Sequence, residues 1–371
     1  MTNLFCAGTL ALGLAAAAAA AQQEVTFDGK AARVIENDKL ALTILSGGGA
    51  MVQLLRKDDP SKLNPLEGLG HFLCVDGFGS VSKEERAAGL PGHGEAYRTP
   101  WELQSATRND GTSTVVLGAR LPIVQEVFRR TIRVVDGEHV VYIDTELESL
   151  LGFDRPVNWA EHATIGGAFL EQGKTVTEMS ASRSMTRPHE SPLPAPPVRH
   201  QLADGKAFTW PMAPTVNGSA IDMRVAPSAT DIVDHTTSLM DPSKRLVYIT
   251  AFHPGKRALL GYVFRRDEYP WTQIWDSYPS GGKRSFRGLE FSTQPFDLPR
   301  RQVIQSNALF DTPTYRWLPA KSTITSSFLM FYVATPEGFS KVDDVVLGEK
   351  RLTVEDRTSG KRIVLPVSRG L

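Results

Sequence analysis

Hydrophobic and polar residues alternate along most of the chain after its first two dozen positions. Segments 113–121, 126–135 and 139–148 are rich in Val, Ile, Phe, Tyr and Thr, and the dipeptides Asp110-Gly111 and Asp136-Gly137 separate consecutive segments of this kind. A period of two residues places every second side chain on one face of a sheet, and Asp-Gly favours a tight hairpin turn. This region therefore predicts antiparallel strands joined by hairpins.

The same pattern returns in the second half of the chain, and only one short segment, 82–88, suggests a helix. The further strands that we expect are 245–252, 258–265, 326–333, 351–355 and 362–365. Long antiparallel runs with short turns indicate an all-β fold, a large antiparallel β-sandwich. No Gly/Ser linker is visible, so we expect a single domain over 22–371, with the proline-rich stretch 188–197 as a surface loop.

The first residues of the chain have a different character from the rest. Positions 4–21 form an apolar run that ends in consecutive alanines, and Gln22, Gln23 and Glu24 follow. This pattern predicts a signal peptide over 1–21 and therefore an exported protein, periplasmic or secreted, with no membrane association after cleavage. A single membrane anchor is the alternative. Without the leader, Cys74 is the only cysteine, so no intramolecular disulfide is expected.

Charge and composition narrow the expected partners. The sequence has 41 Lys+Arg and 41 Asp+Glu residues, none of them within the leader. Nucleic acid is not expected as a partner, because phosphate binding requires a basic surface and no basic block is present. Neutrality suits an uncharged small molecule. The oligomeric state cannot be derived from the sequence.

Three segments place a proton-handling residue among glycine, tryptophan and polar neighbours. His93 lies between two glycines in the segment 91–101, His162 follows Asn158-Trp159-Ala160-Glu161, and Glu290 lies in an apolar setting within 287–295. Partial burial would raise the pKa of Glu290 and make it a usable base near neutral pH. Two histidines and a carboxylate suffice to move protons on and off an oxygen-rich substrate, if the fold brings them together.

Several neighbouring residues have both a functional and a structural interpretation. Trp101 and Trp275 could stack on a sugar ring or pack in the core. Glu161 could contact a ligand or orient His162, although adjacent strand residues point to opposite faces. Asp276 could bind a sugar hydroxyl or be one polar position of a core strand. The sequence leaves each of these alternatives open.

Taken together and in this order, the three segments resemble the aldose 1-epimerase (galactose mutarotase-like) superfamily. The segment Pro91-Gly92-His93-Gly94 with Trp101-Glu102-Leu103 after it is similar to the first histidine motif, and 158–162 is similar to the second. Residues 288–295 resemble the glutamate motif of this superfamily, and residues 37–51 resemble its opening hairpin. The likeness covers roughly residues 30–335.

The resemblance implies a galactose mutarotase-like β-supersandwich and interconversion of the anomers of a free sugar. It implies that His162 protonates the ring oxygen, that Glu290 deprotonates the anomeric hydroxyl, and that His93 stabilises charge at the ring oxygen. It also implies an arginine in contact with substrate, for which Arg98 is the candidate, and it implies no metal or organic cofactor. We expect His162 and Glu290 on opposite sides of one sugar-sized cleft.

Two other hypotheses compete with the epimerase. A carbohydrate-binding protein without turnover would use exposed aromatic residues, for which the candidates are Trp159, Trp210, Trp271, Trp275 and Tyr278. A metal site would use histidines and carboxylates, for which the candidates are His93, Glu95, Glu161 and His162.

Overall fold

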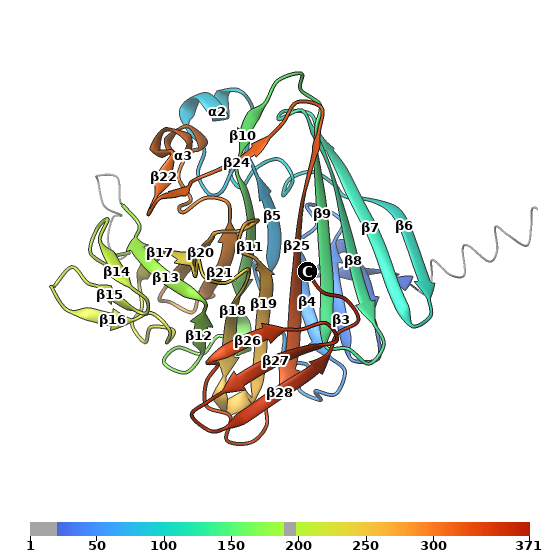
Figure 1. The fold of residues 1–371 in the computed structure, drawn as a ribbon, viewed down its shortest axis with the longest axis vertical. Helices are drawn as coiled ribbons and strands as arrows, with labels where there is room; N and C mark the ends of the chain where they lie inside the picture. The colour runs from blue at the N-terminus through green and yellow to red at the C-terminus, as the bar shows by residue number, and fades with distance from the viewer. Residues whose placement is uncertain (1–20, 189–197) are drawn as a thin grey trace, which may run out of the picture.

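Two large antiparallel β-sheets pack face to face in the computed structural model, which describes residues 21–188 and 198–371 (Figure 1). The expected signal peptide lies outside the described residues, except for Ala21, and so does the proline-rich loop, except for Pro188. Alternating side chains from the two sheets form one continuous apolar core between them. The prediction of a large all-β sandwich is confirmed.

The first sheet has eleven strands, in the order β1-β2-β3-β4-β5-β11-β21-β20-β17-β13-β14. Its strands are β1 (Gln23–Phe27), β2 (Lys30–Glu36), β3 (Leu40–Leu45), β4 (Met51–Arg56), β5 (His71–Val75), β11 (Trp159–Ile165), β13 (Ala181–Thr186), β14 (Ala207–Thr209), β17 (Ile232–Met240), β20 (Trp271–Tyr278) and β21 (Phe286–Ser292).

The second sheet has eight strands, in the order β12-β18-β19-β25-β9-β8-β7-β6. Its strands are β6 (Glu102–Asn109), β7 (Thr112–Leu121), β8 (Glu126–Val135), β9 (Val140–Ser149), β12 (Val176–Met179), β18 (Leu246–His253), β19 (Ala258–Arg265) and β25 (Thr323–Ala334). The predicted segments 113–121, 126–135, 139–148, 245–252, 258–265 and 326–333 all lie here, with small differences at their ends.

Four small sheets and four short helical segments complete the described chain. The small sheets pair β10 (Arg155–Val157) with β24 (Arg316–Leu318), β15 (Met212–Pro214) with β16 (Ala220–Asp222), β22 (Ala308–Leu309) with β23 (Thr312–Pro313), and β26 (Asp344–Leu347) with β27 (Arg351–Asp356) and β28 (Lys361–Pro366). The helices are α2 (Lys83–Ala87), α3 (Arg300–Ser306) and the 3-10 turns η1 (Gly167–Phe169) and η2 (Pro254–Lys256).

Helix α2 shows how a local signal in the sequence fixes an element. The Ser82 hydroxyl accepts a hydrogen bond from the backbone N–H of Glu85, and the Glu85 carboxylate accepts one from the backbone N–H of Ser82. This reciprocal cap satisfies two amide donors at the start of the helix. The predicted helix over 82–88 is confirmed. Helix α3 was not predicted. In the described part of the chain, no helix has both the length and the apolar character needed to cross a membrane.

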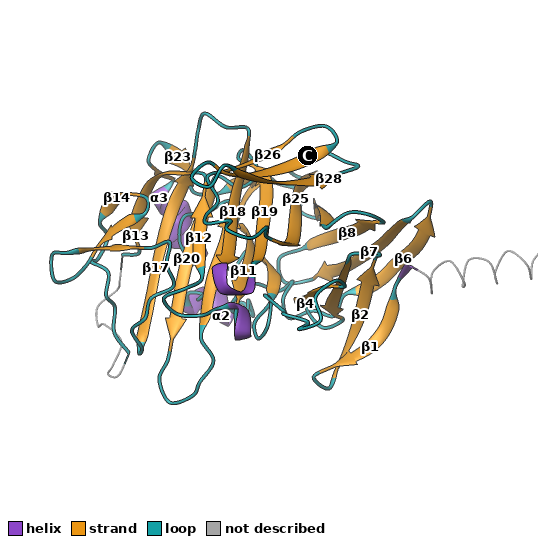
Figure 2. Ribbon diagram, turned by 90° about the horizontal axis from the view of Figure 1, so that it is seen from below, coloured by secondary structure: helices purple, strands orange, loops and turns teal. Residues whose placement is uncertain are grey.

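The order of strands in the first sheet determines where the chemistry lies. Strands β5, β11, β21, β20 and β17 are consecutive neighbours, although they come from widely separated parts of the sequence. One face of these strands packs on the second sheet. The other face lies beneath the loop that contains α2, and Figure 2 shows α2 in front of this part of the sheet.

Candidate active site

Five neighbouring strands each place one side chain on the same face of the eleven-stranded sheet. In strand order they are Phe72, His162, Glu290, Trp275 and His235. His162 pairs in register with Phe72 and Trp275 pairs with His235. Glu290 lies opposite His162, between the register pairs Glu161–Phe291 and Thr164–Gly288. Because side chains alternate along a strand, these five residues share the face that is turned away from the core.

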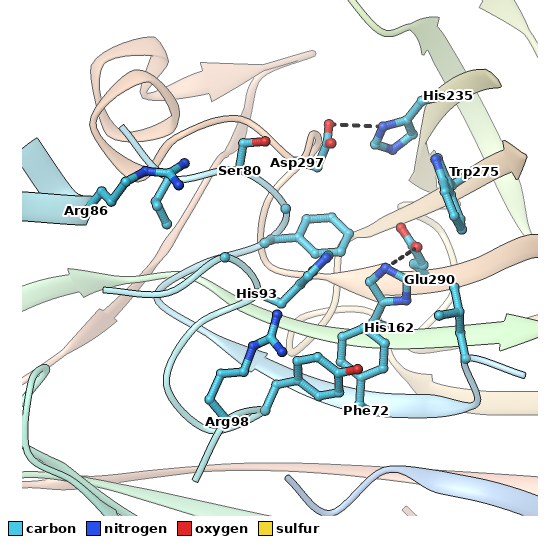
Figure 3. A pocket seen from close by; sticks show the side chains of 16 residues that line it. Phe72, Ser80, Arg86, His93, Arg98, His162, His235, Trp275, Glu290 and Asp297 are labelled. Carbon is cyan, nitrogen blue, oxygen red and sulfur yellow. Dashed lines mark hydrogen bonds and ion pairs between the residues drawn. The ribbon is translucent and has the colours of Figure 1, made fainter. Parts of the chain in front are cut away.

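A cavity of about 530 Å³ opens on this face (Figure 3). The five strand residues form its floor, and loop residues that include His93, Arg98 and Asp297 form its walls. This volume falls within the range of about 300–1,000 Å³ that is typical of small-molecule sites. Of the eight expected site residues, five therefore line one cavity: His93, Arg98, His162, Trp275 and Glu290.

His162 and Glu290 form a buried pair at the floor of the cavity. Their Nε2 and Oε1 atoms are 3.1 Å apart, and the other ring nitrogen of His162 is 3.0 Å from the Thr164 hydroxyl. The Phe72 ring stacks on the His162 ring with 4.2 Å between centroids. Packing on one face, the Thr164 hydroxyl at Nδ1 and the Glu290 carboxyl group close to Nε2 hold the imidazole in one orientation.

The surroundings of this pair disfavour charge on both members. Burial, with a further contribution from His93, lowers the pKa of His162 well below its ordinary value. Burial, with a further contribution from Asp297, raises the pKa of Glu290 well above its ordinary value. Both shifts favour the uncharged forms, so that Glu290 tends to keep its proton and His162 tends to remain a neutral imidazole.

His93 reaches the cavity from a tight loop above the sheet. Its backbone has a φ of 65°, and its N–H donates to the carbonyl of Gly79 over 3.0 Å. A side chain at the next residue, Gly94, would place its Cβ only 2.1 Å from the carbonyl oxygen of Val75. The sequence Gly-His-Gly thus allows the loop to press against β5. The His93 ring then lies edge-on to the His162 ring, 5.1 Å between centroids.

Glu161 does not face the cavity, and the expectation that it contacts a ligand is wrong. Its side chain points to the core, because it is adjacent to His162 on the same strand. There it is fully buried and accepts from Arg130 Nη2 over 2.6 Å, and it lies 2.9 Å from His71 Nε2. Glu161 neutralises a buried arginine and does not orient His162.

Trp101 and Asp276 also lie outside this cavity, which corrects two further expectations. Trp101 is 3% exposed and packs edge-on against Phe128 in the core, where its indole N–H donates to the carbonyl of Ala96. Asp276 alternates with Trp275 and so points to the opposite face. It is buried beside Arg287 and lines a separate pocket of about 290 Å³.

The aromatic residues proposed for a binding protein divide in the same way. Trp275 lines the cavity, whereas Trp159, Trp271 and Tyr278 are fully buried and Trp210 packs against the core.

The four residues considered for a metal site, His93, Glu95, Glu161 and His162, do not come together. Glu161 lies on the other face of the sheet, and Glu95 accepts hydrogen bonds from the backbone of Ile123 and Val124. Within residues 21–188 and 198–371, no group of three or more His, Cys, Asp or Glu side chains could hold a metal ion.

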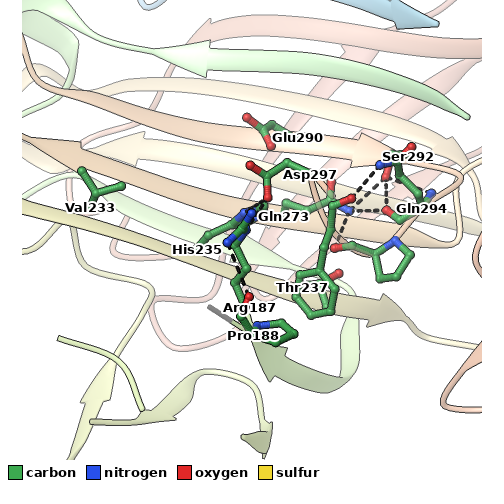
Figure 4. A network of polar contacts seen from close by, with 12 residues as sticks. Arg187, Pro188, Val233, His235, Thr237, Gln273, Glu290, Ser292, Gln294 and Asp297 are labelled. Carbon is green, nitrogen blue, oxygen red and sulfur yellow. Dashed lines mark hydrogen bonds and ion pairs between the residues drawn. The ribbon is translucent and has the colours of Figure 1, made fainter. Parts of the chain in front are cut away.

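The structure adds a polar group that the sequence did not indicate. Asp297 accepts a hydrogen bond from Arg187 Nε over 2.5 Å, and its Oδ1 is 3.1 Å from Nδ1 of His235 (Figure 4). Burial opposes ionisation of Asp297, but His235 and Arg187 outweigh it and hold the pKa of this carboxyl well below its usual range. The one feature of the sequence that could have indicated this group is the run of polar residues 234–238, which includes His235 and lies within a strand.

The resemblance led us to expect His162 and Glu290 on opposite sides of the cleft. This expectation is wrong. The two residues are side by side on adjacent strands and in direct contact. The physical reason is the antiparallel register, which sets directly opposed residues of neighbouring strands about 5 Å apart at Cβ. A ligand would therefore approach both groups from the same side.

Comparison with solved structures identifies the fold. A galactose mutarotase-like protein from Clostridium acetobutylicum superimposes with a TM-score of 0.59 at 12% identity, covering 85% of this chain and 98% of that one. A candidate aldose 1-epimerase from Klebsiella pneumoniae gives 0.59 at 10% identity, covering 85% and 83%. A galactose mutarotase-like protein from Lactobacillus casei gives 0.55 at 13% identity, covering 81% and 100%.

Comparisons of the sequence gave no such result. No protein-family model matches it, and no curated protein matches it significantly. The likeness is therefore one of three-dimensional architecture: this chain has the galactose mutarotase-like β-sandwich fold.

Proposed function

We propose that this protein is a carbohydrate epimerase that interconverts the anomers of a free sugar by acid–base catalysis in the cavity above His162 and Glu290. One observation carries the proposal. Nε2 of His162 and Oε1 of Glu290 are 3.1 Å apart, and both residues line a cavity of small-molecule size. Ring opening of an aldose needs one proton removed from the anomeric hydroxyl and one added to the ring oxygen.

The pair meets this requirement without a net gain or loss of protons. One member takes the proton of the anomeric hydroxyl while the other gives a proton to the ring oxygen, and the C1–O5 bond breaks to give the open-chain aldehyde. Rotation about the C1–C2 bond and the reverse transfers close the ring to the other anomer. Because the two groups share one side of the cleft, the sugar would present both oxygens to them on one edge of its ring.

The surrounding residues support sugar binding. Trp275 offers a partly exposed indole face, and His93 lies at contact distance from the His162 ring. Arg98 lines the opening, with its guanidinium 5.0 Å from the centroid of the Tyr97 ring. Apolar faces with a few placed polar groups are typical of carbohydrate sites.

Polarimetry of freshly dissolved aldoses tests the proposal. The wild-type protein should accelerate mutarotation of at least one aldose, and Glu290→Gln should lower the rate constant by about 10²–10⁴-fold, because one proton-transfer partner is lost. Glu102→Gln, on an exposed position of β6 that does not line the cavity, is the matched control and should leave the rate unchanged. No acceleration for any aldose, or full activity of Glu290→Gln, would refute the epimerase.

A second candidate function is sugar binding without turnover. The direct contact between His162 and Glu290 favours it, because two groups that satisfy each other are less available to a substrate. Calorimetry that detects sugar binding, together with unchanged mutarotation rates, would support this candidate. Loss of that binding in Trp275→Ala, by about 1–3 kcal/mol for a lost aromatic contact, would locate the ligand in the same cavity.

We also propose that the protein acts outside the cytoplasm, on the basis of the apolar segment 4–21. N-terminal sequencing of the protein from extracellular or periplasmic fractions tests this. A mature terminus near residue 22 is the expected result, and recovery of the intact chain from the cytoplasm would contradict it.

A further inference from the structure

A second cavity of about 610 Å³ adjoins the one above His162 and Glu290. The two share five lining residues, Ser80, Val81, His235, Trp275 and Asp297. Two cavities with common walls are parts of one cleft. Val233 and Arg187 line only the second part, whereas Glu290 lines only the first.

His235 and Asp297 stand at the junction of the two parts. The Asp297 carboxylate can only accept hydrogen bonds, so Nδ1 of His235, 3.1 Å away, carries a hydrogen. The other ring nitrogen, Nε2, is then the polar atom of His235 that is left for another partner. His235 is 5% exposed, and its Nε2 has no hydrogen-bond partner among the described residues.

An unpartnered buried ring nitrogen of this kind is a position prepared for a ligand hydroxyl, which can both donate and accept a hydrogen bond. Leaving a buried polar atom without a partner costs free energy, which a hydrogen bond to a ligand hydroxyl would recover. Arg187 Nε donates over 2.5 Å to the same oxygen of Asp297, Oδ1, that lies 3.1 Å from Nδ1 of His235, so Arg187 and Asp297 together fix the orientation of the His235 ring. Figure 3 shows Asp297, His235 and Trp275 grouped at one end of the first cavity.

Trp275 provides an apolar surface beside the His235 ring. It pairs in register with His235 on the neighbouring strand and lines both parts of the cleft. An aromatic face next to a fixed hydrogen-bonding atom is the combination that recognises a sugar ring, whose faces are apolar and whose rim carries hydroxyls.

The size of the cleft identifies the class of ligand. Each part alone falls within the range of about 300–1,000 Å³ for a whole small-molecule site. A single sugar ring at the His162–Glu290 pair would therefore leave the second part empty. We propose that the cleft binds a glycan of at least two rings, with the reducing-end ring at this pair and the next ring beyond Trp275, against His235 and Asp297.

This inference rests on the proposed function, and a comparison of substrates separates the two. Mutarotation is measured for glucose and galactose and for reducing disaccharides of the same sugars, namely cellobiose, maltose and lactose. At least one disaccharide should exceed its monosaccharide by about tenfold in kcat/KM, which corresponds to about 1.4 kcal/mol. If the protein binds sugars without turnover, the same ratio is measured in Kd by calorimetry.

Two variants test the second part of the cleft directly. Val233→Trp fills the second part of the cleft from a half-buried position on β17, and His235→Phe removes the ring nitrogens of His235 but keeps an aromatic ring. Each should bring the disaccharide-to-monosaccharide ratio down to about one. Val364→Trp, an identical substitution at an exposed position of β28, is the matched control and should keep the wild-type ratio. Melting temperatures check that each variant is folded.

Three outcomes decide the matter. A preference for a disaccharide that disappears in Val233→Trp supports the inference. Equal values for one and two rings in the wild-type protein, or a preference that survives in Val233→Trp, overturn the inference and leave the epimerase proposal intact. Absence of any sugar binding or turnover overturns both.

Discussion

Two histidine–glutamate pairs lie back to back across strand β11 and perform different tasks. On the core side, His71 Nε2 is 2.9 Å from Glu161 Oε2. On the cavity side, His162 Nε2 is 3.1 Å from Glu290 Oε1. Glu161 and His162 are consecutive residues, so alternation along a single strand sends one to each pair. The residue types and the distances are nearly the same, and only the surroundings differ.

The decisive difference is a third partner. Glu161 also accepts from Arg130 over 2.6 Å and from the indole N–H of Trp159 over 3.2 Å. Burial opposes its ionisation, but Arg130 and His71 outweigh burial and lower its pKa. No arginine or lysine lies within ion-pair distance of Glu290 among the described residues, and burial raises its pKa.

The comparison teaches how one motif becomes structural or reactive. An arginine fixes the charge of Glu161, and a fixed charge in a closed core cannot exchange protons. Without a cation, Glu290 keeps its proton near His162, at the floor of a cavity that a ligand can enter. Perturbed carboxylates of this second kind are typical of catalytic sites.

The largest effect on stability should come from the core pair. Glu161→Gln leaves the buried Arg130 without its counter-charge, and we expect it to lower the free energy of unfolding by about 3–5 kcal/mol. Urea denaturation measures this. Glu290→Gln, the same change on the other face, should not destabilise the protein, because burial disfavours the charged form of Glu290 and no arginine or lysine among the described residues pairs with it.

Removal of the arginine as well sharpens this test. In the double variant Arg130→Met with Glu161→Gln, no uncompensated charge remains, and much of the lost stability should return. If Glu161→Gln and Glu290→Gln destabilise the protein equally, the proposed difference between the two faces is wrong.

The pH dependence of turnover should report on the cavity pair alone. The pair holds one proton between the lowered pKa of His162 and the raised pKa of Glu290. Below the pKa of His162 the pair gains a second proton, and no group is left to accept the proton of the anomeric hydroxyl. Above the pKa of Glu290 the pair loses the proton that it would give to the ring oxygen. The mutarotation rate should therefore be flat across neutral pH. A rate that changes through a single histidine titration near its ordinary pKa would contradict a shared proton.

A smaller effect is expected in the pH dependence of stability. The folded pKa of Glu290 is raised, so the native state keeps a proton that the unfolded state releases above its ordinary pKa of 4.5. The contribution of Glu290 to stability is therefore present below that pKa and is lost as pH rises toward the folded pKa. Melting temperatures of Glu290→Gln should exceed those of the wild type more at pH 8 than at pH 4. An identical difference at both values would count against a raised pKa.

The sequence was sufficient for most of the fold and for part of the site. Strands β8 and β19 were predicted with their observed bounds, because alternation and turn residues are features of the sequence within each segment. His93, His162 and Glu290 were identified through their flanking residues, and all three line one cavity.

The remaining site residues depend on which strands are neighbours. Alternation predicted that Glu161 and His162 point to opposite faces but not which face is the core, because both residues are polar. The order β11-β21-β20-β17 brings His235 and Asp297 to the cleft, and nothing local in the sequence encodes that order. For Trp101 and Asp276 too, the sequence could not decide between a site and the core, and the structure places both outside the cavity.

The most direct test of the shared proton is a double-mutant cycle on mutarotation. His162→Asn and Glu290→Gln should each lower kcat/KM by about 10²–10⁴-fold. If the two residues act as one unit, the double variant should be no slower than the slower single variant, since either change alone disables the pair. Losses that multiply in the double variant would show two independent groups and would contradict the account.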